Sequence, residues 1–312
     1  MYSPIAVIDI GSNSARVIIS QQLTSNSFQL IYEEKSKVRI GEGAYLKDGY
    51  LQDIPLQRAY VALKSFKSEI VKFPNLNKVI CIATSALRDA PNGQEFVEYI
   101  KKELQIDINI IDGKKEAYYG ALSVLKLLHI ENGITIDIGG GSTDMGLIKD
   151  SKIVDTYSLN LGTVRLKELF SDKTKSIEKV DEYIENELKS LPVHFTSSNA
   201  IGIGGTARTL SKVIMSLQGK RSKTIHDFSY NFELYEEFFS KIILSNNKLL
   251  KELSISKSRL DTIKEGTLIW KKVLEKIQAK KVIGSAVGVR EGLFLENSNL
   301  MESKTPIRFI TT

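Results

Sequence analysis

Cysteine and proline are scarce in this chain of 312 residues, which has one cysteine and six prolines. A single cysteine cannot form an internal disulfide, and Cys81 lies in the apolar run 79–83, where a buried, unreactive thiol is expected. No apolar run approaches the ~18 residues needed to span a bilayer. The N-terminus shows no basic segment followed by an apolar stretch and a cleavage site. We therefore expect no membrane partner and a reducing, cytoplasmic location.

A strong excess of one charge is also lacking, because 43 Lys and Arg stand against 37 Asp and Glu, for a net charge of +6. The basic residues are spread along the chain, without a basic arm, zinc-finger spacing or an aromatic-rich RNA-binding motif, so no nucleic-acid partner is expected. The three histidines show no metal-binding spacing. The mild positive excess suits a polyanionic ligand of another kind.

The most informative feature is a phrase that occurs twice, 128 residues apart, as AVIDIGSNS at 6–14 and ITIDIGGGSTD at 134–144. Each copy has a β-branched run ending in Asp, a turn of small residues and a second apolar run, which predicts strand, tight turn and strand. Glycine lets the backbone approach a ligand closely, and successive turn N–H groups form an anion-binding concavity. The two copies predict two lobes that hold one phosphate chain and its metal from opposite sides.

The order of apolar patterns predicts an α/β fold in two lobes, because 312 residues exceed the size at which one core stays convenient. Each lobe is expected to have three strands followed by alternating helices and strands. We place the lobes at 1–124 and 125–312, with the tail from about 300 to 312 either packing back on the first lobe or fraying. In the second lobe, helical spacing predicts long helices over about 206–217, 231–245 and 258–278.

Seven short motifs occur in order along the chain. They are DIGSNS (9–14), ATSALRDA (83–90), DGKKEA (112–117), DIGGGSTD (137–144), LGTVRL (161–166), GIGGT (202–206) and GVREG (288–292). This set resembles the Ppx/GppA family of exopolyphosphatases and guanosine pentaphosphate phosphohydrolases, in a short two-domain form. The resemblance implies two ribonuclease-H-like lobes of the actin, sugar-kinase and Hsp70 superfamily, with a cleft between them. Longer family members add helical C-terminal domains.

Glu116 is the predicted catalytic residue, since it matches the family's catalytic Glu and follows Asp112 at a predicted loop-to-helix junction. A carboxylate there can orient a water molecule and accept its proton. Its spacing alone favours a residue of the first helical turn that complements the helix dipole, and the family resemblance reverses that preference.

The predicted ligands of Mg²⁺ are Asp137 and Asp144, with Asp9 contacting the ion through water. Arg165, Arg259 and Arg290 lie within or near family-like stretches, but each is as well explained by a structural ion pair. The predicted phosphate-binding residues are Gly11, Ser12, Asn13, Ser14, Arg16, Arg88, Gly139, Gly140, Gly141, Ser142, Thr143, Gly204, Gly205 and Thr206.

The resulting functional prediction is a Mg²⁺-dependent phosphohydrolase that releases terminal phosphate from inorganic polyphosphate or guanosine pentaphosphate by water attack in the cleft. A homodimer is possible in this scheme. One alternative is an ATP-dependent kinase or ATPase of the same superfamily, although no sugar-binding insertion is found. The other is a non-catalytic alarmone or polyphosphate sensor, which the presence of Glu116, Asp137 and Asp144 disfavours.

Overall fold

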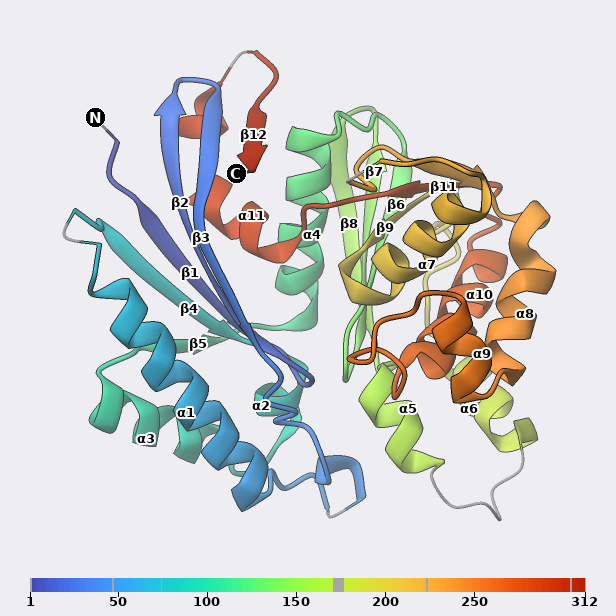
Figure 1. Ribbon diagram of the computed structural model, residues 1–312, viewed down its shortest axis with the longest axis horizontal. Coiled ribbons are helices and arrows are strands. Elements are labelled where there is room, and N and C mark those ends of the chain that lie inside the picture. The colour runs from blue at the N-terminus through green and yellow to red at the C-terminus, as the bar shows by residue number, and fades with distance from the viewer. Residues whose placement is uncertain are drawn as a thin grey trace.

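A computed structural model describes residues 2–46, 48–73, 75–170, 177–222, 224–303 and 305–311. The strands form two six-stranded sheets, one in each lobe (Figure 1), in the orders β12-β3-β2-β1-β4-β5 and β10-β11-β9-β6-β7-β8. The strands are β1 (Ile5–Ile10), β2 (Ala15–Thr24), β3 (Ser27–Ser36), β4 (Lys78–Ala83), β5 (Ile108–Ile110), β6 (Gly133–Ile138), β7 (Thr143–Lys149), β8 (Lys152–Leu159), β9 (Asn199–Ile203), β10 (Ser229–Asn231), β11 (Lys281–Gly284) and β12 (Arg308–Thr311).

The central parts of the two sheets share one topology. β1, β2 and β3 form an antiparallel meander, and so do β6, β7 and β8. The first strand of each meander also pairs in parallel with the next strand along the chain, β1 with β4 and β6 with β9. The predicted strand, turn and strand are therefore confirmed in both copies of the duplicated phrase, which occupy the equivalent β1–β2 and β6–β7 connections.

Helices pack on both sheets, and none within the described residues is long and apolar enough to cross a membrane. Three short 3₁₀ turns lie at Ala44–Leu46, Glu233–Tyr235 and Asn299–Glu302. The helices are α1 (Asp53–Ile70), α2 (Ser85–Asp89), α3 (Gly93–Leu104), α4 (Gly113–Leu127), α5 (Thr163–Leu169), α6 (Ile177–Lys189), α7 (Gly204–Leu217), α8 (Glu236–Leu244), α9 (Asn247–Glu252), α10 (Ile263–Lys276) and α11 (Val289–Glu296).

Two of the predicted helices begin later than expected. The edge strand β10 and a 3₁₀ turn take up the start of the range 231–245, and α8 begins only at Glu236. Turns occupy 257–262, so α10 begins at Ile263 instead of 258. Backbone N–H groups of Arg259 and Thr262 close these turns by donating to carbonyls three residues earlier, at 2.8 and 3.0 Å. This segment faces the first lobe, because Asp261 pairs with Lys37 there, and it also carries Arg259.

Each lobe has its own hydrophobic core. In the first lobe, the apolar face of α1 buries Leu63 and Phe66 against the sheet, as the helical spacing of these residues predicts. In the second lobe, Trp270 of α10 is completely buried. Cys81 is buried in the first core, as expected, and burial raises the pKa of its thiol.

Each of two helices, α4 and α11, packs toward the sheet of the lobe other than the one whose strands it follows in the chain. Figure 1 shows the two helices side by side between the sheets. α4 packs on β6, β7 and β8, whereas α11 packs on α4 and β1, and β12 then pairs with β3. A Cβ atom on Gly292 of α11 would lie 2.0 Å from the carbonyl oxygen of Tyr119, so only glycine permits this approach of α11 to α4. The segment that returns to the first sheet thus starts near 289. Positions 304 and 312 of the expected tail lie outside the described residues. The expected boundary between 124 and 125 falls inside α4.

Candidate active site

A cleft lies between the lobes, where the two duplicated turns face each other. Residues of both sheets line it, together with the first turns of α4, α7 and α11. Of the predicted site residues, those that line the cleft are Asp9, Gly11, Ser12, Asn13, Ser14, Arg16, Glu116, Asp137, Gly139, Gly140, Ser142, Gly204 and Gly205.

The two duplicated turns are closed by equivalent backbone hydrogen bonds, from Gly11 N to the Ser14 carbonyl at 3.1 Å and from Gly139 N to the Ser142 carbonyl at 2.9 Å. The turns approach each other closely, because a Cβ atom on Gly140 would lie 2.7 Å from the Cβ atom of Ser12. Two loops of backbone N–H groups and hydroxyls therefore converge on one volume, an arrangement suited to the oxygens of a phosphate chain.

The start of α7 forms a third wall of the cleft. Gly204 has a φ of +71° in the left-handed region, and a Cβ atom there would lie 2.0 Å from Oδ1 of Asp137. A Cβ atom on Gly205 would meet the guanidinium of Arg259. Position 204 therefore requires glycine, whereas a side chain at position 205 would displace the guanidinium of Arg259. The first turn of this helix can present its N–H groups to an anion. Thr206 does not line the cleft, because its buried side chain lies next to Gly266.

Glu116 lies in the first turn of α4, and its side chain is 15% exposed. Its Oε2 atom is buried and accepts no hydrogen bond from any described residue. The nearest cation is Arg88, whose Nη1 lies 3.8 Å from that atom. Burial raises the pKa of Glu116 well above its usual value, and repulsion by Asp144, Asp9 and Asp137 raises it further. A proton acceptor with a raised pKa is what general-base catalysis near neutral pH requires.

The three predicted metal ligands lie near the ends of three strands, Asp9 on β1, Asp137 on β6 and Asp144 on β7. Asp137 and Asp144 are directly opposite each other in the β6–β7 ladder. Asp144 accepts hydrogen bonds from Ser158 at 2.5 Å and Ser142 at 2.9 Å, yet burial raises its pKa to about 7. Asp9 receives the Nη1 of Arg290 at 3.2 Å, and burial raises the pKa of its carboxyl as well.

The chemistry of these groups fits a magnesium ion, although the described residues include no group of three or more His, Cys, Asp or Glu that could hold a metal ion together. Mg²⁺ commonly binds one or two carboxylates and fills its remaining positions with water and substrate phosphates. The buried oxygen of Glu116 has no hydrogen bond within the described residues, and burial raises the pKa values of Asp9, Asp137 and Asp144, so a bound cation would favour the ionised form of these carboxyls. Hard oxygen donors of this kind are the ligands that Mg²⁺ prefers.

Four arginines bring positive charge to the cleft, and the site prediction included only Arg16 among them. Arg16 pairs with Glu33 at 3.1 Å, while burial and the nearby Arg290 and Arg208 lower its pKa to about 10. Arg290 lines the cleft and also pairs with Asp9, so it is both a residue of the cleft lining and a member of an ion pair. Arg259 also lines the cleft. No motif pointed to Arg208, which lies on α7 four residues after the Gly204 turn that was recognised.

The remaining predicted residues lie behind the lining. Thr143 donates to the Leu161 carbonyl at 2.6 Å, and Gly141 accepts from Nε of Arg165 at 2.8 Å. Arg165 also pairs with Asp89 of the first lobe at 2.5 Å, so it has the structural role that was left open for it. Among the described residues, five predicted site residues do not line the cleft: Gly141, Thr143, Asp144, Thr206 and Arg88. Conversely, the lining includes Thr84, Ser85, Thr163 and Gly288, which the site prediction did not name.

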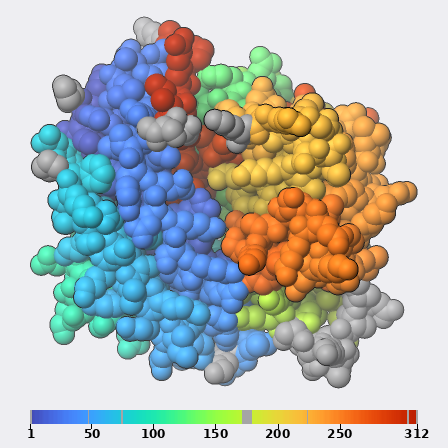
Figure 2. All heavy atoms as spheres, viewed as in Figure 1, coloured from blue at the N-terminus to red at the C-terminus, as the bar shows by residue number. Residues whose placement is uncertain are grey.

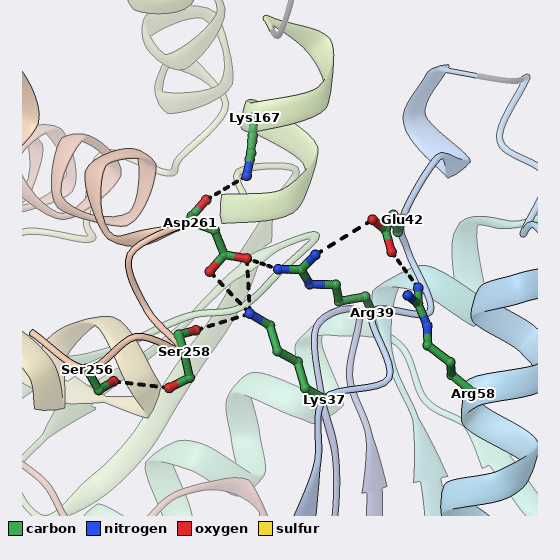
Figure 3. A network of polar contacts seen from close by, with 8 residues as sticks. All are labelled: Lys37, Arg39, Glu42, Arg58, Lys167, Ser256, Ser258 and Asp261. Carbon is green, nitrogen blue, oxygen red and sulfur yellow. Dashed lines mark hydrogen bonds and ion pairs between the residues drawn. The ribbon is translucent and has the colours of Figure 1, made fainter. Parts of the chain in front are cut away.

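The lobes are joined at the edge of the cleft by an ionic contact that we call the latch, formed by Lys37, Arg39 and Asp261 (Figure 3). Nζ of Lys37 donates to Oδ2 of Asp261 at 3.0 Å and to the Ser258 carbonyl at 3.3 Å, and Arg39 contacts the same carboxylate. Figure 2 shows the orange surface of the second lobe against the blue surface of the first. The latch thus connects the end of the first meander to the turns before α10 of the second lobe.

Two lobes of one topology, each contributing a strand–turn–strand to the cleft between them, define the class of protein. The fold is that of two ribonuclease-H-like lobes in the actin, sugar-kinase and Hsp70 superfamily. More narrowly, the chain belongs to the Ppx/GppA phosphatase family, whose family model matches residues 17–300. A solved structure of the Aquifex aeolicus family member has a TM-score of 0.78 and 27% sequence identity, covering 98% of this chain and 100% of that one.

Among curated proteins, the chain is similar to the bifunctional 3-dehydroquinate synthase/phosphatase of Fusobacterium nucleatum, with 32% identity over 95% of this chain and 45% of the relative. It is also similar to the guanosine-5'-triphosphate,3'-diphosphate pyrophosphatase of Pseudoalteromonas atlantica, with 28% identity over 94% of this chain and 58% of the relative. The chain spans about half the length of these two relatives.

Proposed function

We propose that the protein is a Mg²⁺-dependent phosphohydrolase that releases terminal phosphate from inorganic polyphosphate, from guanosine pentaphosphate, or from both. Membership of a phosphatase family supports this reaction class. The observation that carries the proposal is the carboxylate of Glu116, whose buried oxygen has no hydrogen-bond donor among the described residues and lies in a cleft built from two anion-binding turns.

In the proposed reaction, N–H groups and hydroxyls of the two turns bind phosphate oxygens, and the cleft arginines neutralise their charge. Glu116 orients a water molecule in line with the scissile phosphoanhydride and accepts its proton, since no cleft histidine is available in the described lining for that task. Water attack on phosphorus then releases orthophosphate, and the shortened chain leaves as the other product.

Bound Mg²⁺ would neutralise charge on the bridging and terminal phosphate oxygens, which is its usual part in phosphoryl transfer. Oxygens for it are available from one or two of Asp9, Asp137 and Asp144, together with water and the substrate. Burial raises the pKa of each of these carboxyls, and a cation among them would favour their ionised form, which supports that assignment.

The test is phosphate release with Mg²⁺ from polyphosphates of several lengths and from guanosine pentaphosphate, beside the Glu116→Gln variant. Release by the wild type and its loss in the variant are expected. A parallel incubation with ATP and sugar or acyl acceptors tests for a kinase, since phosphorylated acceptor with intact polyphosphate would overturn the hydrolase proposal. Tight binding without turnover would indicate a sensor.

The proposal includes a cytoplasmic location, which the lone, buried Cys81 supports. The possible homodimer stays a prediction, and sedimentation of the purified protein would test it.

A further inference from the structure

A row of charged side chains extends from the cleft along β3. Lys35 lies directly opposite Arg16 in the β2–β3 ladder, and side chains of opposed residues share one face of the sheet. Arg16 lines the cleft. Residues two apart on a strand also share a face, so Glu33 and Lys35 follow one another along this row, and Lys37 comes directly after β3 ends at Ser36. Glu33 pairs with Arg16, and Lys37 reaches Asp261 of the second lobe, so the row faces the space between the lobes.

The cations of this row differ in whether they have a counterion. Glu33 pairs with Arg16, and Asp261 pairs with both Lys37 and Arg39, as Figure 3 shows for the two latch cations. Lys35 is exposed, and its side chain makes no ion pair or hydrogen bond within the described residues. It is therefore the one member of the described row that is both accessible and without a partner.

Arg259 of the second lobe lies on the other side of the same opening. It lines the cleft in the turn before α10, and its guanidinium makes no ion pair or hydrogen bond with the rest of the described chain. Partial burial, with the positive charges of Arg16, Arg259, Arg290 and Lys37, lowers the pKa of Lys35 to about 8. Positive charge is thus in excess here, and a bound polyanion would relieve the repulsion.

We propose that Lys35 binds phosphate groups of the substrate that lie beyond the reacting terminus, and so determines specificity for polyanions longer than the cleft itself holds. This inference rests on the proposed phosphohydrolase function. Two substrates supply such groups, because a polyphosphate chain has internal phosphates and guanosine pentaphosphate has a 3'-diphosphate. Lys35 takes no part in the bond-breaking step, so its contribution is to binding.

The experiment compares Lys35→Gln and Lys35→Arg with a matched control, Lys64→Gln, which removes one charge from an exposed lysine of α1. KM and kcat are measured with tripolyphosphate, long-chain polyphosphate and guanosine pentaphosphate at fixed Mg²⁺. Lys35→Gln is expected to raise KM for the longer polyanions about fivefold, as for the loss of one partly exposed charge contact. We expect Lys35→Gln to leave kcat and the KM for tripolyphosphate unchanged. Lys64→Gln should have the KM and kcat of the wild type with every substrate, and Lys35→Arg should have a KM close to that of the wild type.

A salt titration gives a second readout. For a polyanion, the slope of the logarithm of affinity against the logarithm of salt concentration should become shallower by about one in Lys35→Gln. A purely structural role of Lys35 would not change this slope selectively for the long substrates.

Each outcome decides the matter. A rise in KM confined to long polyphosphate assigns Lys35 to internal phosphates, and a rise in KM confined to guanosine pentaphosphate assigns it to the 3'-diphosphate. An equal change with every substrate, or none, overturns the proposal. If the wild type hydrolyses neither substrate, the phosphohydrolase proposal fails separately, and calorimetric titration of the wild type and Lys35→Gln with long polyphosphate still tests Lys35.

Discussion

Replacing Glu116 with Gln separates catalysis from the helix-dipole role that its position also allows. The change keeps the size of the side chain but removes the charge of an oxygen that accepts no hydrogen bond among the described residues. General-base catalysis contributes roughly 10²–10⁴-fold to rate, so phosphate release should fall by about that factor. The variant should be at least as stable as the wild type, because repulsion by Asp144, Asp9 and Asp137 is removed from a desolvated site.

The matched control is Glu95→Gln, since Glu95 is an exposed residue in the first turn of α3, as Glu116 is in the first turn of α4. A carboxylate near a helix N-terminus stabilises that helix by about 0.3–1 kcal/mol. The control should lose about this much free energy of unfolding and retain full turnover.

The assay is initial phosphate release with Mg²⁺, paired with urea denaturation of both variants. Our reasoning would be refuted if Glu116→Gln kept the turnover of the wild type and lost stability as Glu95→Gln does. Glu116 would then be a helix-dipole residue, and the attacking water would need a different base.

The other predictions concern the closure of the cleft and its carboxylates. Asp261→Asn weakens the latch with Lys37 and Arg39, so the free energy of unfolding should fall by about 1 kcal/mol, less at high salt; a loss that is independent of salt would contradict an ionic latch. Gly140→Ala places a Cβ atom 2.7 Å from that of Ser12, so the turns must separate at a cost of about 1–3 kcal/mol, with loss of phosphate release; wild-type behaviour in denaturation and turnover would show that the turns need not touch. Burial raises the pKa of Asp144 from 3.8 to about 7, so this carboxyl stabilises the fold fully below about pH 4 and loses that contribution as pH rises to about 7. In metal-free buffer, the free energy of unfolding should therefore decline over this pH range more steeply in the wild type than in Asp144→Asn. Equal slopes for the two proteins would contradict the raised pKa of Asp144.

Local patterns in the sequence were enough to place most of the elements around the site. The duplicated phrase predicted two strand–turn–strand units because β-branched runs and small turn residues act through their immediate neighbours. It also predicted the opposed turns, since Gly140 can approach Ser12 only where both lack bulky side chains. Glu116 was recognised because its motif is contiguous, and the structure places it in the cleft.

The boundaries of the second-lobe helices could not be predicted in the same way. Apolar spacing runs through 258–278, yet the chain turns until Ile263, where packing of the core around Trp270 begins the helix. Arg259 lies within those turns and lines the cleft. A periodicity argument sees the apolar face of a segment but not the tertiary contacts that end it.

The sequence by itself determined the two lobes, their shared turn and the acidic residues at the strand ends, because these depend on short-range chain geometry. Only the tertiary structure decided which cations face the cleft: Arg16 comes from β2, Arg208 from α7 and Arg290 from α11, which crosses back to the first sheet. Likewise, Lys35 lacks a counterion while Lys37 has Asp261, more than two hundred residues away. Charges separated so far along the chain meet only through the packing of whole lobes, and no local pattern encodes that meeting.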